Sequence, residues 1–168
     1  MDYLSHYESP VGTITLASDG EFLTGLWFDG QKYDGSAFFH RNSIEKALPI
    51  FSQAKNWLDI YFSGKAPCFT PPLKIVGSEF QKNVLEILSK IPFGRSTAYG
   101  KIAREIAEKS GKEFMSAQAV GGAVAHNPIS LIVPCHRVLG SSGKLTGYAG
   151  GIERKKFLLA LEGIPFKV

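Results

Sequence analysis

Three side chains that could do covalent chemistry stand next to one another at Cys135, His136 and Arg137, directly after Pro134. A cysteine reacts as its thiolate, so a reactive thiol needs a base or a positive charge close by. The imidazole and the guanidinium can supply both. The competing interpretation is an inert cysteine beside a surface histidine, because cysteine is often simply buried. The three residues alone leave both interpretations open.

The segment before these residues limits how they can cooperate. Residues Ile129 to Val133 predict a buried strand that ends at Pro134. Successive side chains of a strand point to opposite faces, so Cys135 and His136 share a pocket only if the chain bends at the proline. A bridging water is then the simplest path for a proton between the two side chains.

Glu162 is a candidate third member of such a site. It lies at the C-terminal end of a predicted helix over Ile152 to Glu162, which Gly163 ends. The helix macrodipole disfavours a carboxylate there by roughly a few tenths of a kcal/mol or more. The carboxylate is therefore either a solvated residue that tolerates a small penalty, or the acid that orients the histidine in a Cys–His–acid relay.

Two predicted helices lie upstream of the reactive residues, joined by a turn at Gly111. The first is expected to begin at Ser96 or Thr97, and the second to run from Ser116 to about His126. This order resembles a helix-turn-helix, although any two amphipathic helices joined by a glycine turn look alike.

The second of these helices is built almost entirely from small residues, with Gly121 and Gly122 adjacent in its interior. A glycine inside a helix costs about 0.5–1 kcal/mol relative to alanine. Such a surface indicates close approach by an external partner or, equally, close packing against another helix of the same protein.

The first third of the chain predicts a small antiparallel sheet. Turn residues separate short β-branched and aromatic runs over residues 3–8, 13–17 and 22–28. A polar loop over residues 29–36 follows, and helical periodicity then extends from Ile44 to Tyr61.

Three prolines between residues 66 and 77 disfavour a helix or a central strand, so we expect a domain connection there. Beyond the connection, Ser78 is expected to cap a helix that closes at Ile91. The predicted organisation is an N-terminal domain with its linker over residues 1–72 and a second domain over residues 73–168.

The composition is that of a globular protein. The 168 residues are 44% hydrophobic and 20% charged, which argues against disorder, collagen and coiled coil. No run approaches the roughly 18 apolar residues of a membrane span, and no signal-peptide pattern opens the chain. Two cysteines, Cys68 and Cys135, make no disulfide framework, so a cytoplasmic location is expected. A net charge of +4 tilts weakly towards an acidic partner such as nucleic acid.

The surroundings of the cysteine resemble a known family. The run Ile132–Val138 closely resembles the active-site signature of the O6-methylguanine-DNA methyltransferases. Residues Ala119–Ala123 and Asn127–Pro128 are similar to the recognition helix and the asparagine loop of that family, and Ser141–Gly151 is similar to its substrate loop. The resemblance covers about residues 78–165.

The resemblance implies a fold and a partner. The fold is an α/β N-terminal domain, a small antiparallel sheet plus helix of ribonuclease-H-like shape, followed by a mostly α C-terminal domain with a winged helix-turn-helix. The recognition helix of this family enters the minor groove, which small residues allow. The partner implied is double-stranded DNA that contains O6-alkylguanine, with O4-alkylthymine as a second substrate and the damaged base flipped into the protein.

The resemblance also implies roles, carried over position by position. Cys135 accepts the alkyl group irreversibly, in a single turnover. His136 takes the thiol proton through a water, Glu162 orients the histidine, and Asn127 braces the loop. Tyr99 helps to rotate the phosphate and donates a hydrogen bond to the leaving guanine.

Substrate and DNA contacts follow from the same resemblance. The guanine pocket is expected at Val138, Tyr148, Ala149 and Lys155; a loop anchor at the tyrosine and a solvated helix residue at the lysine are the alternatives. The residues expected to contact DNA are Gln118, Ala119, Gly122, Tyr99 and Arg137.

The sequence departs from the family pattern at Gln118, where many members carry an arginine, and at Ala149, where a serine is common. His6 and His40 have no cysteine partner nearby in sequence, so no metal is expected, nor any cofactor, and a monomer is the expected state.

Three other functions compete with repair. They are a non-catalytic binder of alkylated DNA, an alkylation-sensing regulator and a thiol hydrolase. The cysteine argues against the first, the short chain against the second, and the Gly/Ala helix with the basic charge against the third.

Overall fold

The computed structural model describes residues 2–33 and 43–168, which form two structural units. Unit 1 comprises the chain up to Val76 together with Pro128–Ser130, and unit 2 comprises Gly77–Asn127 and Leu131–Val168. Among the described residues, no helix combines the length and the apolar character needed to cross a bilayer.

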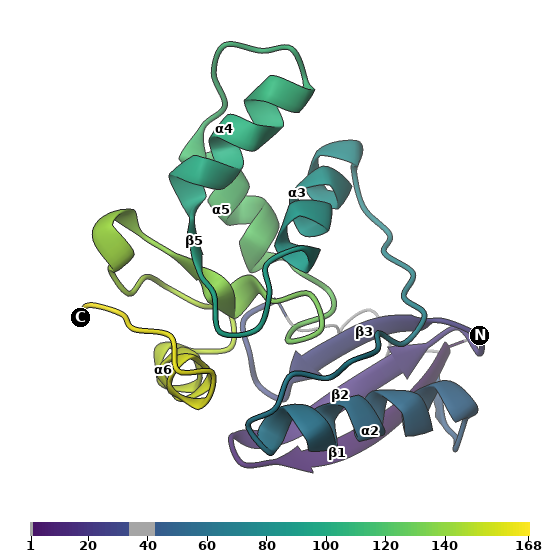
Figure 1. The fold of residues 1–168 in the computed structure, drawn as a ribbon. Helices are drawn as coiled ribbons and strands as arrows, with labels where there is room; N and C mark the ends of the chain where they lie inside the picture. The colour runs from purple at the N-terminus through teal and green to yellow at the C-terminus, as the bar shows by residue number, and fades with distance from the viewer. Residues whose placement is uncertain (1, 34–42) are drawn as a thin grey trace. The chain divides into compact units, whose positions relative to one another are not determined.

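Unit 1 contains a four-stranded sheet with the order β3-β2-β1-β4 (Figure 1). Its strands are β1 (Asp2–Ser9), β2 (Gly12–Ser18), β3 (Leu23–Phe28) and β4 (Ser43–Glu45). The first three form the antiparallel meander that the turn residues predicted, and β4 adds parallel to β1. The β1–β2 turn needs its glycine, because Gly12 has a φ of 115°.

Helix α2 (Pro49–Phe62) covers one face of this sheet (Figure 1). The predicted helix start at Ile44 was wrong, because residues 43–45 pair with β1 instead. Proline suits the first turn of a helix and holds the residue before it extended, so Leu48 ends the extended segment and Pro49 begins the helix. The predicted apolar face from Phe51 onward is buried as expected.

Two short segments pair with the edge of β3. The Leu23 N–H donates to the Pro72 carbonyl at 2.9 Å, and the Leu26 N–H donates to the Pro128 carbonyl at 2.9 Å. The proline-containing segment is thus neither helix nor central strand, as predicted. Of the predicted loop over residues 29–36, the structure describes residues 29–33; the rest, like His40, lies outside the described residues.

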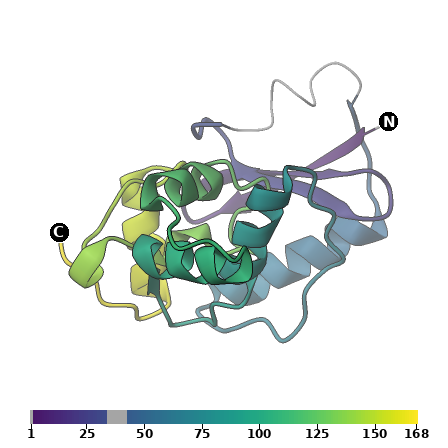
Figure 2. The ribbon, with the colours of Figure 1, turned by 90° about the horizontal axis from the view of Figure 1, so that it is seen from above.

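Unit 2 is built on three helices that pack against one another (Figure 2). They are α3 (Glu79–Ser89), α4 (Tyr99–Lys109) and α5 (Ala117–Ala125). Both predicted serine caps are present: the hydroxyl of Ser78 accepts from the Gln81 N–H at 3.1 Å, and that of Ser116 accepts from the Gln118 N–H at 3.1 Å. Helix α6 (Ile152–Leu161) follows later and ends just before Gly163.

Two predictions in unit 2 were wrong. Helix α4 begins at Tyr99, because Thr97–Ala98 forms strand β5 and pairs in parallel with β6 (Val138–Leu139). Of the predicted strand over Ile129 to Val133, only Ile129 forms a β-bridge, with Leu26; the residues after it form a turn, with Leu131 at a φ of 70°. Its alternate apolar side chains are buried as predicted, although in a different backbone conformation.

Candidate active site

Cys135 opens a single turn of 3-10 helix, η1 (Cys135–Arg137). Its N–H donates to the Val133 carbonyl at 2.9 Å, which bends the chain at Pro134. Only 4% of the Cys135 residue is exposed. Since the segment is a helical turn, successive side chains point about a third of a turn apart rather than to opposite faces. The side chains of Cys135 and His136 are therefore not forced to opposite faces, as they would be in a strand.

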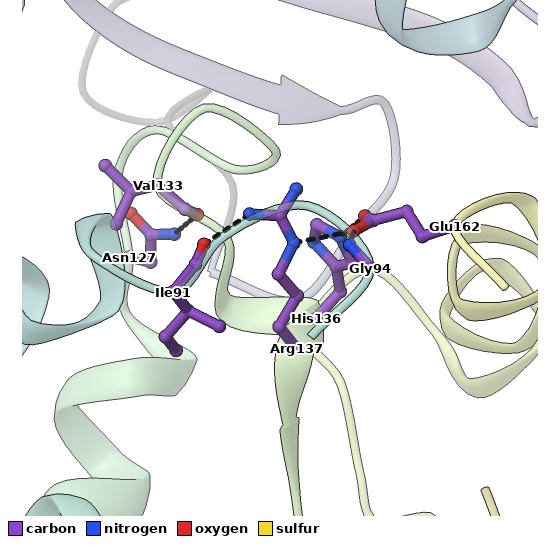
Figure 3. A network of polar contacts seen from close by, with 7 residues as sticks. All are labelled: Ile91, Gly94, Asn127, Val133, His136, Arg137 and Glu162. Carbon is purple, nitrogen blue, oxygen red and sulfur yellow. Dashed lines mark hydrogen bonds and ion pairs between the residues drawn. The ribbon is translucent and has the colours of Figure 1, made fainter. Parts of the chain in front are cut away.

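The imidazole of His136 is bonded to the carboxylate of Glu162. The Nε2 and Oε2 atoms lie 2.5 Å apart, and both side chains are wholly buried (Figure 3). Glu162 is the residue at which α6 ends. Of the two interpretations offered by the sequence, the solvated glutamate is therefore wrong, and the carboxylate that contacts the histidine is the one observed.

Arg137 occupies a different place from the DNA-facing one expected. It is buried, its Nε donates to Oε1 of Glu162 at 2.7 Å, and its Nη1 donates to the Ile91 carbonyl at 2.6 Å (Figure 3). A guanidinium bonded in this way inside the protein is not presented to a phosphate. The expectation of a DNA contact at Arg137 is corrected accordingly.

Asn127 is buried at the end of the turn that follows α5. Its Nδ2 donates to the Val133 carbonyl at 2.8 Å (Figure 3). This bond ties the residue that follows the recognition-helix candidate to the residue two places before the cysteine. Asn127 thus lies where a brace of the loop is expected to lie.

The thiol and the imidazole both favour their neutral forms. Burial raises the pKa of Cys135, against the lowering effects of hydrogen bonds from Asn127 and Tyr148 and of the Lys155 charge. Burial lowers the pKa of His136, and the Glu162 carboxylate opposes that shift. Both shifts favour a protonated thiol and a neutral imidazole.

Lys155 is a fully buried ammonium group on α6, which contradicts the solvated alternative. Its Nζ donates to the Val138 carbonyl at 2.7 Å, to Oγ1 of Thr146 at 3.3 Å and to the Gly147 carbonyl at 3.4 Å. One side chain thus joins β6 to the predicted substrate loop. Lys155, not Arg137, is the cation that lowers the pKa of Cys135.

Burial lowers the pKa of Lys155 to about 8, from an ordinary value near 10.5. Between these two pH values the unfolded chain binds more protons than the folded protein, so this group makes the free energy of unfolding rise with pH. We expect the difference in unfolding free energy between wild type and Lys155→Met to move by up to about 3 kcal/mol in favour of wild type across this window.

Denaturant unfolding at fixed ionic strength measures this difference. The matched control is Lys156→Met, because Lys156 is the next residue on the same helix, is partly exposed and carries an ion pair with Glu153 at 3.4 Å. The control should show no change over the same window. A pH-independent difference for Lys155→Met would show that its pKa is not displaced.

The other residues expected at the guanine pocket are half-buried or buried. Tyr99 is half-buried at the start of α4, accepts a hydrogen bond from Thr146 at 3.4 Å, and has its pKa raised by burial. Tyr148 and Ala149 are half-buried in the loop, while Val138 is buried beside the cysteine turn.

Two residues of this network were missed by sequence reasoning. Thr146 links Tyr99 to Lys155, and Gly94 donates its N–H to Oε1 of Glu162 at 3.0 Å (Figure 3). Gly94 has a φ of 82°, so the proline–glycine pattern could mark it as a turn residue. Nothing in that pattern indicates which carboxylate the turn contacts.

The exposed face of α5 carries Gln118, Ala119 and Gly122. A Cβ atom added at Gly121 or Gly122 would meet nothing within 4 Å. Packing among the described residues therefore does not require glycine at these two positions.

The other candidate groups that the structure describes lie apart from the cysteine turn in the sequence. His6 bonds to Glu45 at 2.9 Å and to Thr15 at 3.2 Å. Within residues 2–33 and 43–168 no three His, Cys, Asp or Glu side chains are grouped to hold a metal ion. Cys68 is exposed.

Two family models match almost the whole chain. The DNA binding domain of 6-O-methylguanine DNA methyltransferase matches residues 79–164, and the ribonuclease-like domain of 6-O-methylguanine DNA methyltransferase matches residues 3–75. The chain therefore belongs to the 6-O-methylguanine DNA methyltransferase family, and the fold class predicted from the sequence is confirmed.

Individual relatives agree over nearly full length. A methylated-DNA–protein-cysteine methyltransferase of Haemophilus influenzae is 40% identical over 165 residues, which covers 98% of this chain and 88% of the relative. One of Methanosarcina acetivorans is 42% identical over 161 residues, which covers 96% and 98%. The crystal structure of Mycobacterium tuberculosis OGT in complex with DNA has a TM-score of 0.82 at 42% identity and covers 95% of this chain and 92% of its own.

Proposed function

We propose that this protein repairs duplex DNA by moving an alkyl group from O6 of guanine to Sγ of its own Cys135. The observation that carries the proposal is a buried cysteine, adjacent in the chain to a buried His136–Glu162 pair, in a member of a family whose relatives are methylated-DNA–protein-cysteine methyltransferases.

The reaction is a single displacement at the alkyl carbon. A bond forms between Sγ of Cys135 and that carbon, while the bond between the carbon and O6 breaks and leaves its electron pair on the guanine. The thiol proton goes to His136, and the guanine takes up a proton to leave as the neutral base. The thioether is stable, so each molecule acts once.

His136 is suited to receive the thiol proton. Its Nε2 faces Glu162, so Nδ1 is the nitrogen available to act as the acceptor. We propose that a water carries the proton between the thiol and this nitrogen. The imidazolium that forms lies against a carboxylate, which stabilises its charge.

The roles that we propose for Tyr99 and Lys155 concern the guanine and its pocket. We propose that the Tyr99 hydroxyl donates a hydrogen bond to the leaving guanine, whose developing negative charge is the costly feature of the transition state. Burial raises the pKa of this hydroxyl and so keeps its proton in place. Lys155 fixes the loop that carries Tyr148 and Ala149, which we propose to line the guanine pocket with Val138.

The exposed face of α5 is the proposed contact with duplex DNA, through Gln118, Ala119 and Gly122. We propose that the damaged base is flipped out of the duplex to reach the buried thiol, because a sulfur atom at 4% residue exposure cannot approach a stacked base. O4-alkylthymine is a second proposed substrate. We further propose a monomer that acts in a reducing compartment, since the acceptor must remain a free thiol.

The test is an equimolar incubation of the protein with a duplex that contains O6-methylguanine. Mass spectrometry of the digested protein should find one methyl group, on the peptide with Cys135, and chromatography should find guanine restored in the DNA. Binding without methylation would favour a non-catalytic binder. Release of a hydrolysed product with unmodified cysteine would favour a thiol hydrolase.

We expect Gly122→Leu to separate DNA repair from the chemistry. A leucine on the exposed face of α5 should hold the helix away from the groove and slow the duplex reaction by at least tenfold, at an estimated loss of about 1.4 kcal/mol of contact. The reaction with free O6-benzylguanine should be unchanged. Gly122→Ala is the companion variant, and it should raise stability by about 0.5–1 kcal/mol. Equal slowing on both substrates by Gly122→Leu would contradict the groove assignment.

Gln118 gives a second prediction on the same face. An arginine there would add a charge near the phosphates and a larger surface to fill the gap left by a flipped base. Gln118→Arg should therefore tighten duplex binding and steepen its dependence on salt by about one counterion. Gln118→Ala should slow the duplex reaction and spare the free base. If Gln118→Ala slows both reactions alike, the residue supports the pocket instead.

A further inference from the structure

The carboxylate of Glu162 bonds to His136 and also to Arg137 and the Gly94 N–H. His136 bonds to Oε2, while Oε1 accepts from Nε of Arg137 at 2.7 Å and from the Gly94 N–H at 3.0 Å (Figure 3). The two oxygens are thus divided between the imidazole and a second set of donors. That second set has no part in the proton path described above.

Arg137 is itself held on both sides. Its Nη1 donates to the Ile91 carbonyl at 2.6 Å, and its guanidinium carbon lies 5.8 Å from the centre of the Phe93 ring. The Ile91 carbonyl, the Phe93 ring and the Gly94 N–H all belong to the turn between α3 and β5. The arginine therefore joins that turn to the carboxylate, and the carboxylate joins both to the histidine.

We propose that Arg137 is a positioning residue of the proton relay: its guanidinium clamps Oε1 of Glu162 and the turn over residues 91–94, so that Oε2 stays directed at the imidazole of His136. This inference rests on the proposed alkyl-transfer function. It assigns Arg137 to the chemistry rather than to the DNA surface.

The clamp has an electrostatic consequence as well as a geometric one. The charged groups that act on His136 are Glu162 from the end of α6, Lys155 from within α6 and Arg137 from η1, with the neutral Cys135 thiol beside them; the facing turn contributes main-chain groups and the Phe93 ring. Glu162 raises the pKa of the imidazole, whereas Arg137 and Lys155 lower it. Arg137 thus offsets part of the rise that the Glu162 carboxylate causes in the pKa of His136, and it helps to keep the histidine unprotonated.

Removal of the Arg137 charge and removal of the Glu162 charge should therefore shift the pH profile of the rate in opposite directions. Without the Arg137 charge, His136 protonates at a higher pH, so the acid limb of the rate profile should move up by roughly one unit in Arg137→Met. Without the Glu162 charge, the acid limb should move down in Glu162→Gln. General damage to the fold would not produce opposite shifts.

A conservative variant separates charge from geometry. Arg137→Lys keeps a positive charge, but a single ammonium cannot reproduce the fork that reaches both Glu162 and Ile91. We expect its acid limb to stay within about 0.3 units of wild type, while the rate on the plateau falls by roughly tenfold. Arg95→Met is the matched control, because Arg95 is an exposed arginine on the same turn and makes no ion pair among the described residues.

The experiment measures alkylation of full-length protein by free O6-benzylguanine from pH 5 to 9. An NMR titration of the histidine ring follows the pKa of His136, identified by its absence in His136→Gln. Three results together support the proposal. The acid limb of Arg137→Met lies at a higher pH than that of wild type, and Arg137→Lys keeps the wild-type limb but has a lower plateau rate. Arg95→Met matches wild type in both limb and rate. The proposal is overturned by an unshifted or lowered limb in folded Arg137→Met.

The experiment still decides when Arg137→Met does not fold or when wild type is not alkylated. If Arg137→Met does not fold, Arg137→Lys decides, and a wild-type rate with a wild-type profile in that variant would overturn the clamp. If wild type and Arg95→Met are not alkylated, the proposed function fails. The NMR titration then still tests the clamp, because it needs no activity: an Arg137→Met shift in the His136 pKa to higher pH supports it and no shift overturns it.

Discussion

Cys135→Ser should abolish alkyl transfer and leave duplex binding close to that of wild type. The hydroxyl is a far weaker nucleophile than a thiol, and the relay offers only a histidine as base, so transfer should fall to the uncatalysed background. The proposed DNA contact is the exposed face of α5, which the substitution does not touch. The site itself should persist, because serine is slightly smaller than cysteine and the bond from Asn127 to the Val133 carbonyl does not involve the side chain at position 135.

Mass spectrometry after incubation with the damaged duplex measures the transfer, and fluorescence anisotropy measures the binding. Cys68→Ser is the matched control, because it makes the same change at the other cysteine of the chain, which is exposed. The control should accept one methyl group as wild type does. Methylation of Cys135→Ser at a comparable rate would refute the assignment of the acceptor.

Glu162→Gln should slow transfer by about 10² to 10³-fold at neutral pH, within the range ascribed to a positioned base. The amide keeps the shape of the carboxylate but loses its charge, so the imidazolium that forms is stabilised less and the apparent pKa of the thiol rises. The amide nitrogen also meets a donor, either from His136 or from Arg137. A buried guanidinium without its anion typically costs about 3 kcal/mol of stability.

Stopped reactions with O6-benzylguanine and thermal unfolding of the same samples measure the two effects. Glu153→Gln is the control, since Glu153 lies in the first turn of the same helix and is exposed. It should retain the wild-type rate and nearly the wild-type unfolding temperature. A normal rate in folded Glu162→Gln would leave the residue a structural support of Arg137 only.

Local sequence signals predicted the parts of the fold that local chemistry decides. Ser78 and Ser116 cap helices in the way their side chains allow, and Gly163 follows the end of α6. The helix start at Ile44 failed because apolar spacing records burial and not backbone angle, and pairing with β1 determined the outcome. The strand predicted around Leu131 failed for the same reason, because its buried apolar side chains fit a strand or a turn equally well.

The part of the site that the sequence predicted is the part that belongs to the Cys-His-Arg motif and its family resemblance. Residues Cys135 and His136 are adjacent in the chain. The unfavourable place of Glu162 at a helix end made it a candidate, the resemblance gave it the orienting role, and the structure places it against the imidazole. The destinations of Arg137 and Lys155 were not predictable, because a long side chain on a short turn or helix can point to solvent or inward. The partners that hold these two groups inside are main-chain carbonyls at Ile91, Val138 and Gly147, which leave no mark on the sequence.

The open space above Gly121 and Gly122 has a consequence for anyone who evolves this protein in the laboratory. Nothing within 4 Å would oppose a methyl group at either position, and each alanine should stabilise the helix by about 0.5–1 kcal/mol. A library selected for heat resistance alone should therefore accumulate alanine at both sites. Because the same change thickens the surface that we propose to contact DNA, the survivors should lose repair of duplex while they still react with a free base. A screen that uses a small alkylguanine as its only substrate would record these molecules as improved.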